Sequence, residues 1–224
     1  MSEVPHLDIA KIEIQNSDRT KKQLDLNFLL GAEHYIDSMQ TLEWNLNYSS
    51  SNQENIREIL YDDFDQALNL TNQSNRTENE DEDQFRIESN FNYVLKFRKK
   101  SHKLNISALN SYATEKERSS IPEFLTFTTD STPLGLQNNT RTGNDQTQKT
   151  FVGQVDYTLP INKMKIELGA KYNFRDNFND IFVEQQNIAT SAFLRNDLFT
   201  GVTNYTEKIS AIYAQFNNKY ENWT

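Results

Sequence analysis

A two-residue alternation of apolar and polar side chains is the feature that most limits what this chain can fold into. Successive side chains of a β-strand point to opposite faces, so the pattern predicts strands with one apolar and one polar face. It is clearest in the run Gln23, Leu24, Asp25, Leu26, Asn27 and Phe28. Six segments share it: 23–36, 41–49, 84–98, 103–113, 150–159 and 164–175.

Two weaker segments bracket these six. Residues 7–14 and 204–217 carry β-branched and aromatic residues that favour strands. In 204–217 both alternating sets contain apolar residues, so the pattern leaves its facing open. A few apolar residues also fall on the polar face of the clear strands, namely Leu29, Val94, Leu109 and Val152.

The connections alternate between short and long. The short ones are 36–41, 98–103 and 160–163, and the polar segments 50–83, 114–149 and 176–203 are predicted to be long loops. Compact soluble domains seldom contain such long loops, whereas transmembrane barrels have tight periplasmic turns at one rim and long external loops at the other. The clear strands also have the roughly 9–11 residues that cross a bilayer.

The composition fits a wall with water on one side. Hydrophobic residues make up 36% of the 224 residues and the mean hydropathy is −0.80, yet aromatics reach 12%. Disordered chains are poor in aromatics, so the apolar residues must be concentrated in particular stretches. No run of about 20 apolar residues provides a transmembrane helix. The net charge of −9 disfavours a nucleic-acid binder.

Aromatic residues fall near the ends of the predicted strands. Such residues form girdles at the two membrane interfaces of a barrel, although aromatics also suit strands in general. We favour the girdle interpretation for Trp44, Tyr48, Phe85, Phe97, Tyr112, Phe151, Tyr172 and Phe174.

The sequence offers little for catalysis. Three separated histidines have no metal-ligand spacing, cysteine is absent, and Ser, His and Asp form no nucleophile motif. We therefore predict no enzyme, with no catalytic, cofactor-binding or metal residues. The acidic stretch 78–83 and the group Asp62, Asp63 and Asp65 could bind calcium, but a solvated external loop is the better interpretation.

Seven charged residues are predicted to face the water-filled interior. We expect them mainly to form interstrand pairs, although a plug or a passing ligand could also contact them. They are Asp25, Glu43, Arg86, Glu88, Asp156, Glu167 and Lys171.

The C-terminal part of the chain resembles the outer-membrane β-barrel domain of TonB-dependent receptors of the Bacteroidetes type. The resemblance rests on Gln154-Val155-Asp156-Tyr157 up to Pro160, on 165–171 (KIELGAK) and on 204–215 (NYTEKISAIYAQ), followed by Trp223. Residues 1–149 match this family only in layout.

The resemblance implies a bacterial outer-membrane protein whose relatives have about 22 strands, enclose a plug domain and import ligands with energy relayed by TonB. This chain shows no plug, and Met1 is not followed by a signal peptide. We therefore expect residues 1–224 to be one partial barrel domain of a receptor for an unidentified ligand.

The predicted fold class is all-β: an antiparallel up-and-down meander of about eight strands, forming an incomplete segment of a large transmembrane barrel. Two alternatives stay open. One is a complete eight-stranded outer-membrane barrel with an anchoring or structural role. The other is a soluble all-β carbohydrate-binding module or enzyme, in which the apolar faces of two sheets would pack against each other.

Overall fold

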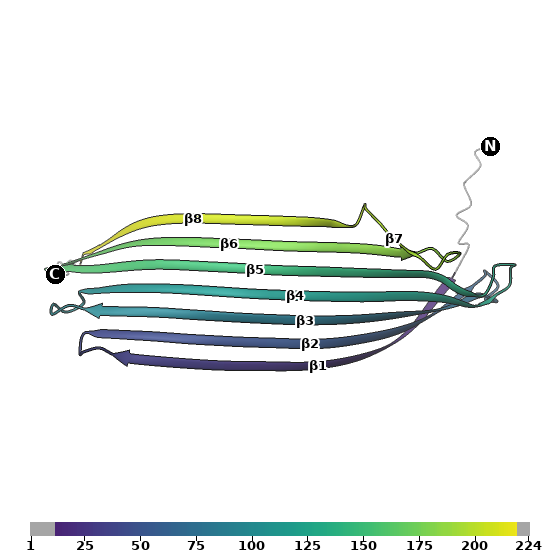
Figure 1. Cartoon of the computed structure of the whole chain (residues 1–224), viewed down its shortest axis with the longest axis horizontal. Helices are drawn as coiled ribbons and strands as arrows, with labels where there is room; N and C mark the ends of the chain where they lie inside the picture. The colour runs from purple at the N-terminus through teal and green to yellow at the C-terminus, as the bar shows by residue number, and fades with distance from the viewer. Residues whose placement is uncertain (1–11, 219–224) are drawn as a thin grey trace, which may run out of the picture.

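The computed structural model describes residues 12–218, which form one antiparallel sheet (Figure 1). Each strand up to β6 pairs with the next one in sequence, and β7 and β8 both pair with β6. The strands are β1 (Ile12–Tyr35), β2 (Gln40–Phe64), β3 (Leu70–Lys96), β4 (Lys103–Thr128), β5 (Gly135–Ile161), β6 (Met164–Gln186), β7 (Phe193–Arg195) and β8 (Gly201–Asn218). The predicted all-β antiparallel meander is therefore confirmed.

The strands are much longer than the alternation indicated. Apart from β7, with 3 residues, they have 18 to 27 residues. The prediction of long loops was wrong for most of 50–83 and 114–149 and for about half of 176–203, because these residues continue the strands. An antiparallel ladder is held by backbone hydrogen bonds, so a polar segment with water on both faces can stay in it without any apolar alternation.

The start of the sheet also differs from the prediction. Residues 7–14 do not form a separate strand as far as they are described: 12–14 open β1, which runs on through the segment predicted as 23–36. Residues 7–11 lie outside the described part of the chain. The eight strands are thus seven long ones and the short β7.

Aspartate and asparagine side chains organise several of the turns. Asp65 Oδ1 accepts hydrogen bonds from the backbone N–H of Ala67 at 2.9 Å and of Asn69 at 2.8 Å. Asp37, Asp130, Asn187 and Asn196 likewise accept bonds from backbone N–H groups two residues further on. Such turns explain how polar segments close hairpins without an apolar contact.

The register places the predicted apolar sets of neighbouring strands on one face. In one row across the sheet, Tyr93 is opposite Leu42 and Ile106, and Ile106 is opposite Val155. Directly opposed residues share a face, so the rows form a continuous apolar surface. We call it the apolar face, and the opposite side the polar face.

The register also settles the facing of β8. Ile212 is opposite Ala170, and Phe216 is opposite Ile166, so both lie on the apolar face. Tyr213 is opposite Gly169 and lies on the polar face.

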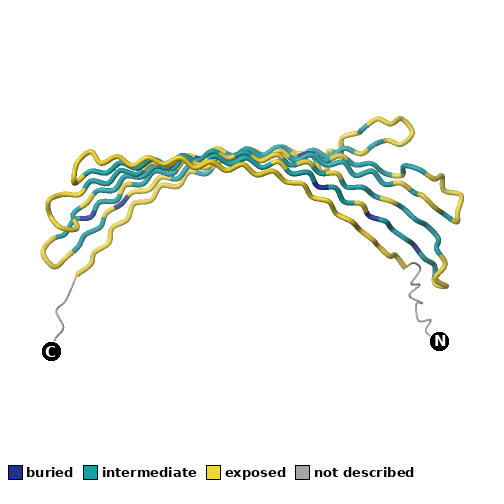
Figure 2. Tube along the Cα trace, turned by 90° about the horizontal axis from the view of Figure 1, so that it is seen from below, coloured by how far each residue is buried: buried dark blue, intermediate teal, exposed yellow. Residues whose placement is uncertain are grey.

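The described residues form one arched layer and contain almost no core (Figure 2). Ile59 is the one buried hydrophobic side chain among them. Leu26, Phe91 and Leu168 are 58%, 39% and 45% exposed. In a sandwich these residues would be buried between two sheets, so the alternative of a soluble two-layer fold was wrong.

Burial indicates which face is concave. The most buried non-glycine residues all have polar-face positions: Asn55, Ile59, Asp63, Ser111 and Thr158. Side chains on the inside of an arch crowd one another, so the polar face is the concave one.

The sheet has two open edges, because β1 and β8 each pair on one side only. Leu24 on β1 is 72% exposed and Ile212 on β8 is 90% exposed. Unpaired edges beside exposed apolar surface are templates for aggregation.

We predict that the isolated 224-residue chain aggregates in detergent-free buffer, because nothing covers its edges or its apolar face. Size-exclusion chromatography with light scattering measures this, and the same chain in detergent micelles is the control. A stable, water-soluble monomer would contradict the prediction.

Candidate functional site

The apolar face carries a row of aromatic rings across β2 to β6. The Phe85 ring centroid lies 5.5 Å from that of Tyr48 and 6.3 Å from that of Tyr112, with edge-to-face geometry. On the neighbouring strands, the rings of Phe151 and Tyr172 are 6.4 Å apart. Phe174 is opposite Phe151 and extends the row. Six of the eight predicted girdle residues therefore form one oblique series that runs from Phe85 to Tyr172, which we call the outer aromatic row.

A second aromatic cluster lies at the end of the sheet that carries the short turns. Phe97 stacks on His102 with centroids 3.9 Å apart, and His102 Nε2 lies 2.8 Å from the Tyr157 hydroxyl. His102, in the turn between β3 and β4, thus joins this cluster. Trp44, the remaining girdle candidate, lies between the two ends and donates from Nε1 to Ser89 at 2.9 Å.

The two aromatic groups bound an apolar band of membrane dimensions. Nine residues of β4, Leu104 to Tyr112, lie between the two groups. A tilted strand needs roughly 9–11 residues to cross a bilayer. Beyond Tyr112, β4 continues to Thr128 with mostly polar residues. The strands therefore project well past the band on the side opposite the short turns.

The register places all seven predicted interior charges on the polar face. Most of their hydrogen bonds are with amides and hydroxyls: Asp156, for example, accepts a hydrogen bond from Gln154 at 2.8 Å. Glu167 pairs with Lys165 of its own strand at 2.5 Å. Interstrand contacts of the seven are with uncharged groups, such as Asn92 with Glu43 and Tyr213 with Asp156. Among residues 12–218 none of them forms an interstrand ion pair, because register sets the face of a side chain but not its partner.

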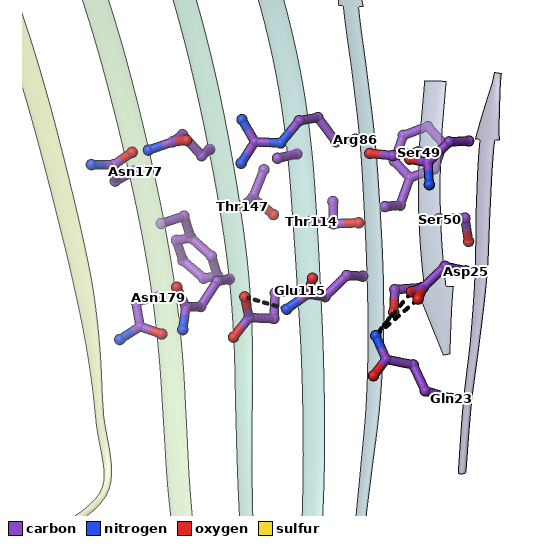
Figure 3. A pocket seen from close by; sticks show the side chains of 18 residues that line it. Gln23, Asp25, Ser49, Ser50, Arg86, Thr114, Glu115, Thr147, Asn177 and Asn179 are labelled. Carbon is purple, nitrogen blue, oxygen red and sulfur yellow. Dashed lines mark hydrogen bonds between the residues drawn. The ribbon is translucent and has the colours of Figure 1, made fainter. Parts of the chain in front are cut away.

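A shallow trough crosses the polar face from β1 to β6, with a volume of about 490 Å³ (Figure 3). On the β1–β4 side the side chains bond one another: Gln23 donates to Asp25 at 3.0 Å, and Gln84 donates to Glu115 at 3.4 Å. The β5–β6 side is lined by amides and hydroxyls, with Asn177 and Asn179 on β6. Sequence reasoning missed this trough because ten of its eighteen lining residues, including all those on β5 and β6, fall in segments predicted as loops.

Four glutamates gather on the polar face just beyond the trough, on β3 and β4. Glu82 is opposite Glu117, with Glu80 and Glu115 in the adjacent rows. Partial burial and the charges of these three neighbours raise the pKa of Glu117. The acidic stretch 78–83 is thus divided, since Asp81 and Asp83 point to the other face.

No group of acidic or histidine residues among positions 12–218 is arranged to hold a metal ion. Within the same range there is no helix long and apolar enough to cross a membrane.

Tyr213 is a polar-face contact that the sequence pattern did not indicate. Its ring covers Gly169, where an added Cβ would meet ring atoms at 2.1 Å. Its hydroxyl donates to Asp156 and also lies 3.1 Å from Gln154 Nε2. An aromatic ring over a cross-strand glycine is a known way to stabilise a sheet, and here it links β8 to β5 across β6.

We predict that Glu117→Gln stabilises the fold at neutral pH by a few tenths of a kcal/mol, because it removes repulsion that water largely screens. A carboxyl whose folded pKa is raised costs stability above that pKa and regains it as pH falls. The advantage of the variant should therefore shrink on acidification. Denaturant unfolding of the detergent-solubilised protein at several pH values measures it.

Glu123→Gln is the control, since Glu123 is opposite Arg76 on the same strand pair and should gain no stability from losing its charge. Equal stabilisation by both variants would contradict the repulsion argument.

The comparison with protein families gives one match. Residues 95–224, more than half of the chain, match the outer membrane protein beta-barrel family. The match covers β4 to β8, including all three segments on which the resemblance to receptors was based. A search of curated proteins finds no match.

The family match and the geometry agree on one interpretation. The apolar band between two aromatic groups has the height of a bilayer core, the polar face is concave, and the strands run antiparallel throughout. The apolar face therefore contacts lipid, in the outer membrane of a bacterium. The chain belongs to the outer membrane protein beta-barrel family.

Proposed function

We propose that this chain is part of the barrel wall of a TonB-dependent receptor, which imports a ligand not yet identified. The observation that carries the proposal is the separation of β1 and β8 at opposite edges of the open sheet (Figure 1). A barrel closed by these strands alone would pair the first with the last. In a wider barrel, further strands would pair with β1 and with β8, so neither edge would be left open.

Two other features support a large receptor barrel. The segments 154–160, 165–171 and 204–215 resemble such receptors, and they form consecutive paired parts of β5, β6 and β8. The concave face is also mostly hydrophilic from β1 to β8, as the wall of a wide aqueous interior should be. In this role the wall keeps lipid from the interior, and the ligand passes along the polar face.

The rival of a small eight-stranded anchor makes a different prediction about the edges. The chain has no cysteine, so introduced thiols report cleanly. For a large receptor we predict that Leu26→Cys on β1 and Ile212→Cys on β8 are not joined by a short thiol cross-linker in the native outer membrane. Ile106→Cys with Val155→Cys, an opposed pair, is the positive control.

The same membranes test the receptor directly. An antibody against this segment should detect a polypeptide far larger than 26.2 kDa, and in-cell formaldehyde treatment should cross-link that polypeptide to TonB. A band near 26 kDa together with edge-to-edge cross-linking would establish the small barrel instead.

The lipid-facing role of the wall predicts a strong asymmetry between neighbouring residues. Val155→Arg places a charge in the apolar band and should cost about 2–4 kcal/mol. Gln154→Arg, one residue away on the polar face, should be tolerated because Arg can still donate to Asp156. Urea unfolding in lipid vesicles, with heat-modifiable gel migration as the readout, measures both. Equal destabilisation would contradict the assignment of faces.

A further inference from the structure

We infer that the β5–β6 side of the trough is a binding site for an uncharged, hydroxyl-rich ligand of the carbohydrate type. This inference rests on the proposed receptor function and adds a ligand class to it. Its basis is a group of four amide side chains, Gln146, Gln148, Asn177 and Asn179, which we call the amide quartet.

The amide quartet consists of two directly opposed pairs. Gln148 on β5 is opposite Asn177 on β6, and Gln146 is opposite Asn179. All four line the trough on the concave face. Two rigid, paired strands therefore hold four amides in adjacent rows, so little side-chain ordering is left for a ligand to impose.

The quartet has unused hydrogen-bonding capacity. None of its members has a side-chain hydrogen bond within the described residues, and the Oδ1 atoms of Asn177 and Asn179 are buried without a partner. This contrasts with the β1–β4 side, where Gln23 and Gln84 already bond to carboxylates. Figure 3 shows the same division: the dashed contacts lie on the β1–β4 side, and Asn177 and Asn179 stand apart from them.

The chemistry of the quartet favours hydroxyl groups. Each amide has two donor hydrogens and one acceptor oxygen, so it can both donate to and accept from a hydroxyl. Tyr205, opposite Asn177 on β8, adds a half-exposed ring on the same face that offers an apolar surface to a sugar. The volume of about 490 Å³ lies within the range of ligand sites.

The surrounding charges select against anions. Arg86 is the one cation of the trough lining, against Asp25 and Glu115. The other three glutamates, Glu80, Glu82 and Glu117, lie directly beyond, toward the projecting end of the strands. Arg175, on the same face as Asn177 and two residues before it, is opposite Glu207 and so adds no net positive charge. An anionic ligand would meet repulsion there, whereas an uncharged ligand would not.

The test uses the full-length polypeptide that carries this chain, purified from the outer membrane in detergent. Its binding is measured by calorimetry and on an array of uncharged oligosaccharides. A hexaglycine peptide and oligogalacturonate serve as amide-rich and anionic probes. We expect binding of at least one uncharged oligosaccharide and none of oligogalacturonate.

The double variant Gln148→Leu with Asn177→Leu should weaken that binding about thirtyfold, since it removes two neutral hydrogen bonds of roughly 1 kcal/mol each. Asn204→Leu is the matched control. Asn204 is opposite Phe178, the residue between Asn177 and Asn179, and therefore lies at the same level of the sheet but on the apolar face. Unchanged heat-modifiable migration shows that each variant is folded.

The inference is overturned if no uncharged oligosaccharide binds, if hexaglycine binds more tightly, or if the double variant binds like the parent protein. None of these outcomes changes the expected result of the TonB cross-linking experiment. The ligand class and the receptor function can therefore fail separately.

Discussion

The antiparallel backbone ladder is the interaction on which the rest of this structure depends. Ordinary domains hold their elements together by burying apolar side chains between layers, but here the described residues form one layer with a single buried hydrophobic residue, Ile59. Cohesion must come from strand pairing that runs without a break for most of each strand. In a bilayer that pairing is obligatory, since an unpaired backbone group in hydrocarbon costs several kcal/mol.

Because the ladder does not depend on side chains, the two faces are free to match two different solvents. Within the apolar band the alternation holds with few exceptions, such as Leu109 and Val152, as lipid touches one face and water the other. Beyond Tyr112 water reaches both faces, and the side chains there are mostly polar while the pairing continues. The change in side-chain pattern along one unbroken strand therefore marks the membrane boundary. The outer aromatic row lies at that boundary.

This separation explains what the sequence could and could not predict. The facing of Leu26, Phe91 and Leu168 followed from alternation, because lipid demands apolar residues at every second position. The continuation of β3 through 70–83 could not be predicted, because a strand with water on both faces has the composition of a loop. The facing of β8 was open for a related reason: Tyr213 is an aromatic residue on the polar face, where it covers Gly169. Cross-strand partners depend on register, and alternation alone does not give the register.

The same reasoning accounts for where the candidate binding residues occur. A trough that can hold a ligand needs rigid strands on a wet face, and the polar face at and beyond the outer aromatic row has both. There Gln148 and Asn177 are fixed by the ladder, yet their amides are not required to hold the sheet together. Residues deeper in the band are constrained on one face by lipid, and residues in the turns, such as Asp65, are occupied in closing them. The paired, polar middle of each strand is therefore the part of the wall where side chains can be devoted to recognition.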